Sequence, residues 1–397
     1  MNKKLEQNIY KDYIFSFLSS LNLTQGVWML YLAYRGLTLF EIGIMESIYH
    51  ITAFSMEVPT GIIADIYGRK TSRIIGRLIS VVAVVTMLFA NSISLFALSF
   101  IFTALGNNLE SGAGEALVYD SLKELGKENQ YMKISGIKEL FFQSASSIAL
   151  IVGGYLATID YALVYKFALV LAIITVIQAF SFTEPNYGKI EKEKNTFSTF
   201  IKQLKTSIKI LKNDRKISFL IIVLEVFSVY FATEFFYVQN LLKISGSTEF
   251  QIGIVLASGS VGGALMAVMV HKIDNIFTPD QLLLFFPILA IIGFWLMTIT
   301  NIIWLAFIFL SIIEGSLFVL IGDYVNRLIP SEQRATIISF QSMLYSILMI
   351  IIFPVIGKLG DVYGLHTAFI IIAIFSTITL GSLVWALKSK SDKFKQL

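Results

Sequence analysis

Seven glutamates lie inside stretches that otherwise have the composition of membrane-spanning helices, and no lysine or arginine lies comparably deep. They are Glu46, Glu57, Glu110, Glu115, Glu225, Glu234 and Glu314. A charged side chain at the centre of a bilayer helix costs roughly 2.5–3.5 kcal/mol, so seven of them cannot all face lipid as bare anions. They must line a water-filled path, pair with other groups or carry protons, which is the chemistry of an ion-coupled transporter.

The composition excludes several other classes of protein. A mean hydropathy of +0.74, with 56% hydrophobic and 15% charged residues, is not that of a soluble domain. The absence of cysteine excludes disulfides, thiolate metal sites and thiol catalysis, and the three histidines lack metal-ligand spacing, so we expect no metal and no other cofactor. The basic N-terminus has no cleavage site and predicts no removable signal peptide. A net charge of +4 is too weak to indicate nucleic acid.

Twelve stretches are apolar and long enough to span a bilayer, which needs roughly 20 residues each. The predicted spans are 12–34, 40–64, 72–90, 94–118, 136–158, 162–183, 217–241, 250–271, 281–299, 303–325, 337–357 and 366–387. The sequence therefore predicts an all-α membrane protein with two pseudo-symmetric six-helix bundles. We expect an N-terminal bundle over 1–183, a cytoplasmic linker over 184–216 and a C-terminal bundle over 217–397.

The distribution of positive charge predicts the orientation. With the N-terminus in the cytoplasm, 27 of the 31 lysines and arginines lie inside and four lie outside. Cytoplasmic loops of membrane proteins carry such an excess. We therefore expect both termini in the cytoplasm and a multi-pass protein of the bacterial cytoplasmic membrane.

The linker contains an amphipathic pattern. Its apolar positions recur at helical spacing and are flanked by lysines; they are Phe197, Phe200, Ile201, Leu204, Ile208 and Leu211. This pattern predicts a helix on the cytoplasmic face of the membrane. The alternative is a simple tether with no regulatory role.

The two halves share a short internal repeat. Residues 38–44, at the start of the second span, and residues 248–254, at the start of the eighth, are identical at five of seven positions. Duplicated six-helix halves are a recurrent plan of transporters.

The loop between the second and third spans contains the decisive motif. Residues 61–70 read Gly-Ile-Ile-Ala-Asp-Ile-Tyr-Gly-Arg-Lys and fit the pattern G-x-x-x-D-x-x-G-R-[KR] at every fixed position. This loop resembles the signature of the major facilitator superfamily, and the length, the six-plus-six layout and the long linker resemble that family as well. Within it, the chain is most similar to the twelve-span drug:proton antiporters of bacteria.

Three residues of the loop have physical roles that the sequence predicts. Gly61 would let the end of one helix approach a neighbour, and Gly68 would permit a turn with positive φ. Asp65 is expected near the first turn of the following helix, where the dipole favours an anion.

The resemblance also implies a conformational latch. In the family this loop breaks and reforms contacts as the two halves move, which makes Asp65 and Arg69 the latch residues here, with Asp120 as a partner. Lys70 and Arg73 would belong to the same latch and hold the loop on the inner side. The alternative is that the basic residues serve only the membrane topology.

A second pattern concerns the direction of transport. The glycine pattern that proton-driven exporters of the family carry on their fifth span is retained in part, with Gly136, Ala145, Ala149, Leu150, Gly153 and Gly154 at its positions. It supports export, whereas the alternative is simple packing of small residues between helices. The arginine that many proton antiporters carry on the fourth span is absent near Phe100 or Ala104.

Three titratable residues lie on one face of the second span. Glu46, His50 and Glu57 are separated by four and eleven residues, or about 40° and 20° of rotation. Both residue types can titrate near neutral pH when they lose water, so the stripe suits a proton path. The alternative is a local Glu46–His50 pair.

The other acids lie on spans that line the cavity in the family. Glu110 and Glu115 are about 140° apart on their helix, and Glu225 and Glu234 about 180° apart, so only one of each pair is expected to face the centre. We assign proton coupling to Glu110, Glu115, Glu314, Glu46, His50 and Glu57.

Aromatic rings near Glu234 indicate a cation as cargo. Tyr230 and Tyr237 share its side of the helix, and an acid beside aromatic rings suits a lipophilic cation. We assign substrate binding to Glu225, Glu234, Tyr230, Tyr237, Asn22 and Gln25. Each acid alone can instead be structural.

The sequence thus predicts a monomeric, proton-coupled exporter of amphipathic cationic or zwitterionic small molecules that works by alternating access, and not an enzyme. Its expected partners are the small molecule, protons and the lipid bilayer, without nucleic acid. Alternatives are a proton-coupled uptake symporter, an exporter of a metal chelate or siderophore and, more remotely, a polytopic membrane enzyme.

Overall fold

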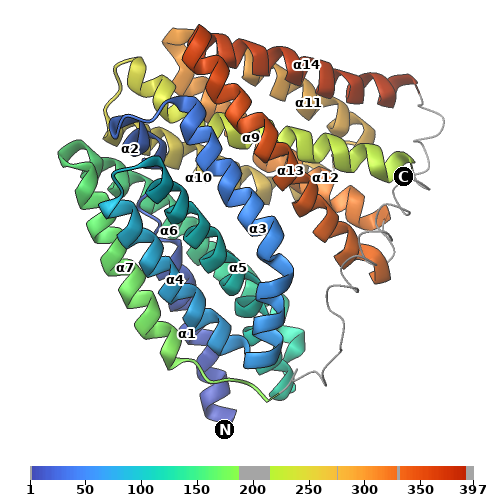
Figure 1. Cartoon of the computed structure of the whole chain (residues 1–397). Helices are drawn as coiled ribbons and strands as arrows, with labels where there is room; N and C mark the ends of the chain where they lie inside the picture. Colours follow the sequence, from blue (N-terminus) through green and yellow to red (C-terminus); the bar gives the residue numbers. More distant parts are fainter. Residues whose placement is uncertain (1, 187–214, 275, 329–330, 390–397) are drawn as a thin grey trace. The chain divides into compact units, whose positions relative to one another are not determined.

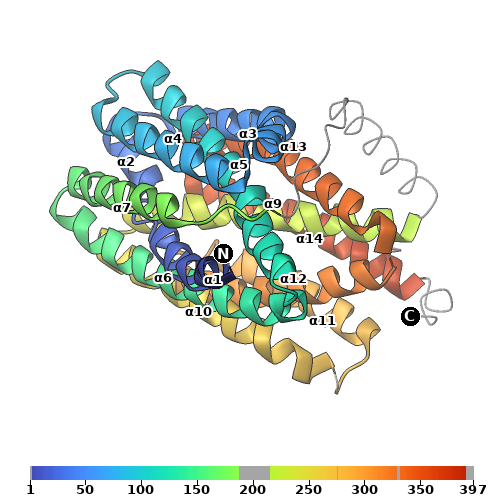
Figure 2. The same ribbon diagram turned by 90° about the horizontal axis from the view of Figure 1, so that it is seen from below.

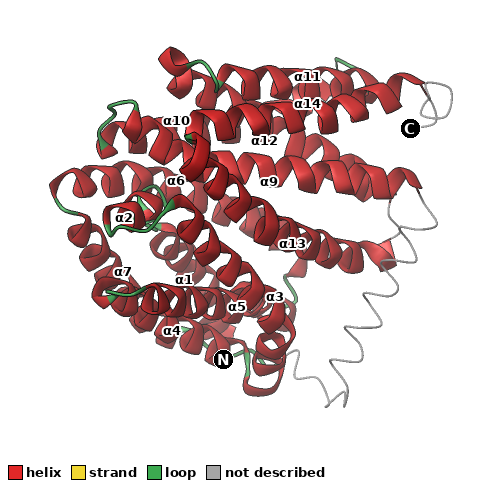
Figure 3. Ribbon diagram, turned by 45° about the horizontal axis from the view of Figure 1, so that its top comes forward, coloured by secondary structure: helices red, strands yellow, loops and turns green. Residues whose placement is uncertain are grey.

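The computed structural model describes residues 2–186, 215–274, 276–328 and 331–389, and its regular structure in these ranges is entirely helical (Figure 3). Contacts divide the chain into two compact units. Figure 1 colours the chain by residue number, from blue at the N-terminus to red at the C-terminus. Unit 1 comprises Met1–Trp28 and Met45–Phe200, and unit 2 comprises Met29–Ile44 and Ile201–Leu397. The amphipathic helix predicted in the linker, from Phe197 to Leu211, lies outside the described residues.

Unit 1 contains five complete helices and most of a sixth. They are α1 (Asn2–Ser20), α4 (Arg69–Phe89), α5 (Ile93–Glu124), α6 (Tyr131–Ile159), α7 (Tyr161–Ser181) and the part of α3 (Leu39–Tyr67) that follows Met45. Helix α4 packs on α5 and α7, and α1 lies against α5, α6 and α7, as the view from below shows (Figure 2). This arrangement brings the polar start of α1 next to α4 and α5.

Unit 2 contains the remaining helices and the start of α3. They are α2 (Trp28–Tyr34), α9 (Arg215–Ile244), α10 (Glu249–Asp274), α11 (Pro279–Leu296), α12 (Ile303–Leu328), α13 (Ser331–Tyr363) and α14 (Leu365–Ser389). Helix α9 contacts α10, α12, α13 and α14. Because four helices surround it, acids on opposite sides of α9 can both be buried.

The first predicted span is interrupted, which corrects the expectation of one helix over 12–34. Helix α1 ends at Ser20 and α2 begins at Trp28. In between, Oδ1 of Asn22 accepts hydrogen bonds from the hydroxyl of Thr24 at 2.7 Å and from its backbone N–H at 3.3 Å. Such local side-chain bonds compete with the helical pattern, so the chain turns although its composition is apolar.

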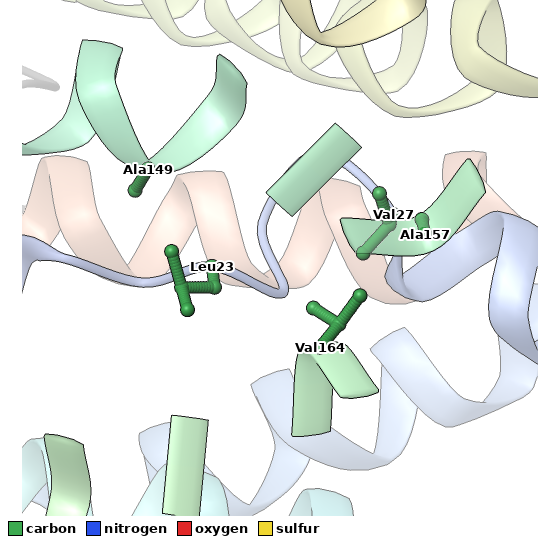
Figure 4. Close-up of a cluster of buried hydrophobic side chains, with 5 residues drawn as sticks. All are labelled: Leu23, Val27, Ala149, Ala157 and Val164. Atoms are coloured by element: carbon green, nitrogen blue, oxygen red, sulfur yellow. The ribbon is translucent and has the colours of Figure 1, made fainter. Parts of the chain in front are cut away.

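The turn between α1 and α2 packs closely on α6 and α7. Its apolar side chains form a buried cluster with those helices (Figure 4), made of Leu23, Val27, Ala149, Ala157 and Val164. A Cβ at Gly153 would collide with the carbonyl oxygen of Leu23. The glycine that resembled part of an export pattern therefore has a packing function in unit 1, since it admits the non-helical backbone.

The internal repeat marks two helix starts with the same chemistry. The hydroxyl of Thr38 accepts from the N–H of Glu41, whose carboxylate accepts from the N–H of Thr38 at 2.8 Å. Thr248 and Gln251 make the same reciprocal pair, with bonds of 2.9 and 3.2 Å. These are capping boxes, and the prediction that the repeat opens the second and eighth spans is confirmed by the starts of α3 and α10.

The helices have the composition of membrane spans. In the described ranges, nine are long and apolar enough to cross a bilayer, and α11 is a shorter apolar helix. The first predicted span is divided between α1 and α2 and the second lies on α3, which are not among these ten helices; the other ten predicted spans lie on them. The number of helices that cross a membrane stays a prediction. Large apolar side chains are exposed on both units, for example Phe89 and Trp385, which suits a lipid environment.

Candidate transport site and latch

The signature loop joins α3 to α4 in a single residue. Gly68 has φ of +98°, which confirms the predicted turn and favours glycine at this position. Arg69 Nη1 lies 2.6 Å from Oδ1 of Asp65, and its Nε lies 3.8 Å from Oδ2 of Asp120 on α5. The three residues that the resemblance assigned to a latch are thus brought together in unit 1.

The anion at the start of α4 is Glu184 and not Asp65, which corrects the sequence prediction. Oε1 of Glu184 accepts from the N–H of Arg69 at 2.7 Å, and Oε2 accepts from the N–H of Lys70, also at 2.7 Å. Asp65 belongs to the end of α3, one helical turn before Arg69, and its carboxylate bonds the Arg69 side chain instead. Gly68 offers no side-chain cap, so a residue 115 positions away supplies the acceptors for these two donors.

Gly61 has no close neighbour in the described part of the chain. A Cβ added there would meet nothing within 4 Å. Unit 1 therefore shows no close helix approach at this glycine among its described residues, and the predicted approach stays a prediction. The close approaches within unit 1 lie elsewhere. At Gly76 on α4, for instance, a Cβ would lie 2.8 Å from the carbonyl oxygen of Gly106 on α5.

Arg73 lies at the centre of a buried charge cluster. Its Nη2 donates to Oδ1 of Asp12 at 3.0 Å, and its Nε lies 3.0 Å from Oε1 of Glu110. Arg77 Nε lies 3.7 Å from the other Glu110 oxygen, and Lys138 Nζ lies 3.6 Å from Oδ2 of Asp12. The cluster joins α1, α4, α5 and α6, and corrects the expectation that no arginine lies deep among the helices.

Two aromatic rings complete the surroundings of Arg73. The guanidinium carbon lies 4.3 Å from the ring centroid of Phe15 and 4.5 Å from that of Phe182. Only 1% of the Arg73 side chain is exposed. A cation stacked between two rings gains cation–π attraction that partly replaces lost hydration. Arg73 is thus a fixed structural centre of unit 1 in this conformation.

The two acids of α5 have different surroundings. Glu110 is paired with Arg73 and Arg77, whereas Glu115 is exposed. Because a carboxylate between two guanidinium groups is compensated, Glu110 has the environment of a structural ion pair. Glu115 lies on a different side of the helix, as the 140° separation predicted.

The predicted stripe on α3 is divided in the structure. Nε2 of His50 lies 3.5 Å from Oε1 of Glu46, and both side chains are largely buried. Glu57 is exposed two turns further along. The arrangement contains the local Glu46–His50 pair and a separate acid.

The acids that the sequence analysis placed inside spans of unit 2 have no basic partner among the described residues, unlike Glu249, which pairs with Lys243. Glu225 on α9 is buried, and its Oε1 accepts from Nε2 of Gln341 on α13 at 3.1 Å. Glu314 on α12 is partly buried, without a hydrogen bond or ion pair to any described residue. The negative charge of each of these two acids is therefore less compensated than that of Glu110, which lies beside two arginines.

Glu234 is the most isolated acid of the described chain. Its exposed fraction is 0%, and both carboxyl oxygens lack a hydrogen-bond partner among the described residues. The neighbouring Thr233 is also fully buried, with no described partner for its hydroxyl. Glu225 and Glu234 are both buried on opposite sides of α9, because helices surround it.

The tyrosines predicted to flank Glu234 are engaged in packing. Tyr230 contacts Phe294 of α11 edge to face at 6.3 Å between ring centroids. Tyr237 donates its hydroxyl to the carbonyl oxygen of Phe353 at 2.9 Å and packs on the Phe353 ring at 4.7 Å. Both rings thus hold α9 to its neighbours inside unit 2.

Asn22 and Gln25 lie in the turn between α1 and α2 and not on a helix. Asn22 is exposed and is used in the local bonds to Thr24. Their assignment to substrate binding stays a prediction, now placed on a turn of unit 1.

Comparison with known families decides the membership of the chain. The family model described as Major Facilitator Superfamily matches residues 13–351 and 242–396. This chain belongs to the Major Facilitator Superfamily. It is therefore a multi-pass membrane transporter of the secondary type, and not an enzyme.

Relatives of this superfamily member agree in length and fold. It is 25% identical over 388 residues to the uncharacterized MFS-type transporter YxaM of Bacillus subtilis (strain 168), with 93% of each chain covered. A crystal structure of a mutant of the nucleoside transporter NupG superposes with a TM-score of 0.80 at 15% identity, over 96% of this chain and 99% of that one. A bacterial homologue of the human lysosomal transporter Spinster, inward-facing and unoccupied, reaches 0.77 at 12% identity, with 97% of each chain covered. The two structures show the shared fold.

Sequence reasoning missed several residues at the end of unit 1 that carries the signature loop. Asp12 is the first residue of a predicted span, and Glu184 the first of a predicted linker, so both read as ordinary boundary charges. Asn8 is fully buried, donates to Ser121 and accepts from the N–H of Thr183 at 3.0 Å. The one available signal was a polar or acidic residue placed just outside an apolar run, which is too common to be specific.

Proposed function

We propose that this superfamily member is a proton-coupled transporter that exports amphipathic cationic or zwitterionic small molecules by alternating access. The observation that carries the proposal is Glu234, a fully buried acid whose two oxygens lack a hydrogen-bond partner among the described residues. Glu225 and Glu314 supply two further acids without a described basic partner.

The physical argument concerns the cost of a buried charge. A bare carboxylate without hydrogen bonds is very unfavourable in a low-dielectric interior. Such a group is stable when it carries a proton or when a cation replaces that proton. A site that accepts one or the other but not both at once couples the movement of protons to the movement of a cationic molecule.

The acids of unit 1 are less suited to this exchange. Glu110 is compensated by Arg73 and Arg77, so removing or adding its proton would disturb a structural pair. Glu46 has His50 within 3.5 Å. We therefore place the central proton exchange at Glu234, assign Glu225 and Glu314 to separate steps of proton or substrate movement, and assign Glu110 to the framework. We assign proton entry to Glu46, His50, Glu57 and Glu115.

The proposal includes the predicted setting. The protein would act as a monomer in the bacterial cytoplasmic membrane. Both termini would lie inside, as the distribution of positive charge predicts. The contacts of Arg69 with Asp65 and Asp120 would then form a cytoplasmic latch that opens once in each transport cycle.

The test is proton movement in energised inside-out vesicles that contain the protein. A panel of lipophilic cations is added, and lumenal pH is followed; export with proton exchange is expected to make the lumen more alkaline. Glu234→Gln keeps the size of the side chain but cannot exchange a proton, so alkalinisation should be lost. Glu128→Gln, an exposed acid outside the proposed path, is the matched control and should leave the signal unchanged.

Two outcomes would contradict the proposal. Undiminished alkalinisation with folded Glu234→Gln would remove this residue from coupling. If no compound of the panel changes the lumenal pH with the wild-type protein, and the protein instead takes up an external substrate together with protons, it is an uptake symporter. Because one structural relative is a nucleoside transporter, the panel includes a nucleoside, and a metal chelate covers the remaining exporter class.

A further inference from the structure

The first turn of α3 is held by a carboxylate from α13. Oδ1 of Asp361 accepts from the N–H of Leu39 at 2.9 Å, and Oδ2 accepts from the N–H of Phe40 at 2.9 Å. Helix N-termini leave several N–H groups without partners inside the helix, and an anion there is also favoured by the dipole. Asp361 thus satisfies two donors at once, from a position more than 320 residues away.

The local cap of α3 does not replace this contact. The Glu41 carboxylate accepts from the N–H of Thr38, the donor just before the two that Asp361 binds. The two acids therefore serve different backbone groups. Removing Asp361 would leave the N–H groups of Leu39 and Phe40 to solvent, while the capping box stays in place.

The helices also approach closely at this point. A Cβ at Gly43 on α3 would lie 2.5 Å from Cα of Pro354 on α13, and a Cβ at Gly357 would collide with the carbonyl oxygen of Leu39. The backbones touch only because both positions are glycines. The start of α3 and the end of α13 therefore pack backbone against backbone, and the Asp361 cap lies next to this packing.

The predicted topology places this contact on the outer side of the membrane. The start of α3 and the end of α13 both lie on the predicted outer side, whereas the signature loop at the far end of α3 lies on the predicted inner side. We propose that Asp361 is an outer latch, which holds the start of α3 on α13 in one state of the cycle and must release it for the outer side to open. This inference requires alternating access but not proton coupling or any particular cargo.

The absence of cysteine from the whole chain permits a direct test. Ile42, one turn into α3, is fully buried, so Ile42→Cys reports whether this contact has opened. Intact cells that express the Ile42→Cys protein are treated with a membrane-impermeant maleimide, and the labelling rate is measured without any substrate. Adding Asp361→Ala should raise the rate about fivefold, the size expected for the loss of one helix cap.

Matched variants separate a latch from a local defect. Asp361→Asn keeps one carbonyl oxygen but no charge and should give an intermediate rate. Gly43→Ala forces the backbones apart by an independent route and should also raise the rate. Glu41→Ala weakens the same helix start without touching α13 and should leave the rate near that of the parent.

Each result supports or overturns the proposal. A folded, monodisperse Asp361→Ala protein whose labelling rate equals that of the parent would show that Asp361 is not a latch. An equal rise in Glu41→Ala would mean that any fraying of α3 exposes Ile42, which also refutes the idea. If Asp361→Ala fails to fold, Asp361→Asn and Gly43→Ala decide the question. Because no transport is measured, a failure of the proton-exchange proposal at Glu234 leaves this result unaffected.

Discussion

Replacing Glu184 with alanine tests whether a distant carboxylate stabilises the signature loop. In the structure its two oxygens bind the first two N–H groups of α4, at 2.7 Å each. Glu184→Ala removes both acceptors and their charge. Gly68, which precedes α4, has no side chain to replace them, so the donors of Arg69 and Lys70 must turn to water.

The size of the effect follows from the two bonds. Loss of a helix cap costs about 0.5–2 kcal/mol, and a hydrogen bond to a charged group contributes about 1.5–3 kcal/mol. Glu184 is only partly buried, so water recovers part of this energy, and we expect a loss of about 2 kcal/mol. For a unit of about 150–250 residues this corresponds to a fall in Tm of about 4–8 °C. Glu184→Gln keeps one acceptor, so its Tm should fall by about half as much.

The assay is thermal unfolding of the detergent-solubilised protein, followed by its intrinsic tryptophan fluorescence. Glu128→Ala, an exposed acid of the same unit, is the control and should change Tm by less than about 1 °C. A Tm for Glu184→Ala that matches this control would refute the assignment of Glu184 as the cap of α4. If the Tm of Glu184→Gln falls further than that of Glu184→Ala, the stability of this helix start does not follow the number of hydrogen bonds that are kept.

Two further predictions concern charges of unit 1. Arg73→Gln leaves the buried acids Asp12 and Glu110 without their central partner, so it should destabilise the protein by about 3–5 kcal/mol and lower Tm more than Glu184→Ala does. At the N-terminal end of α1, the hydrogen bond and charge of Lys127 hold the pKa of Glu6 below its ordinary value of 4.5. The pair therefore stabilises the folded state above pH 4.5 and loses this effect as the pH falls further, so the difference in Tm between wild type and Lys127→Ala should shrink in acid.

The sequence predicted the helices well because apolar composition is a local property. Every predicted span except the first lies on a single observed helix, and the loop pattern led to the contacts of Arg69 with Asp65 and Asp120. The one interruption, near Asn22, escaped because a single polar residue hardly changes the average hydropathy over about 20 residues. The hydrogen bonds of that residue decide the turn, and an average does not register them.

The partners of the charged residues were harder to predict because they lie far apart in the sequence. Glu184 was read as the start of the linker and Asp12 as the edge of a span, yet each binds a residue of α4. Glu110 was assigned to proton coupling because it lies in an apolar segment. Its neighbour Arg73 lies close to a loop rich in positive charge, and the chain alone did not show that the two side chains meet in the interior of unit 1.

The helices on either side of the signature loop share one device. Asp361 caps the start of α3, and Glu184 caps the start of α4, each with two backbone bonds. A cap from within the same helix stabilises it in every conformation. A cap from a distant segment stabilises it only while that segment stays in place, and at about 1 kcal/mol its loss changes a two-state ratio roughly fivefold. Distant caps thus make the starts of α3 and α4 sensitive to rearrangement, which a transporter requires and a rigid scaffold does not.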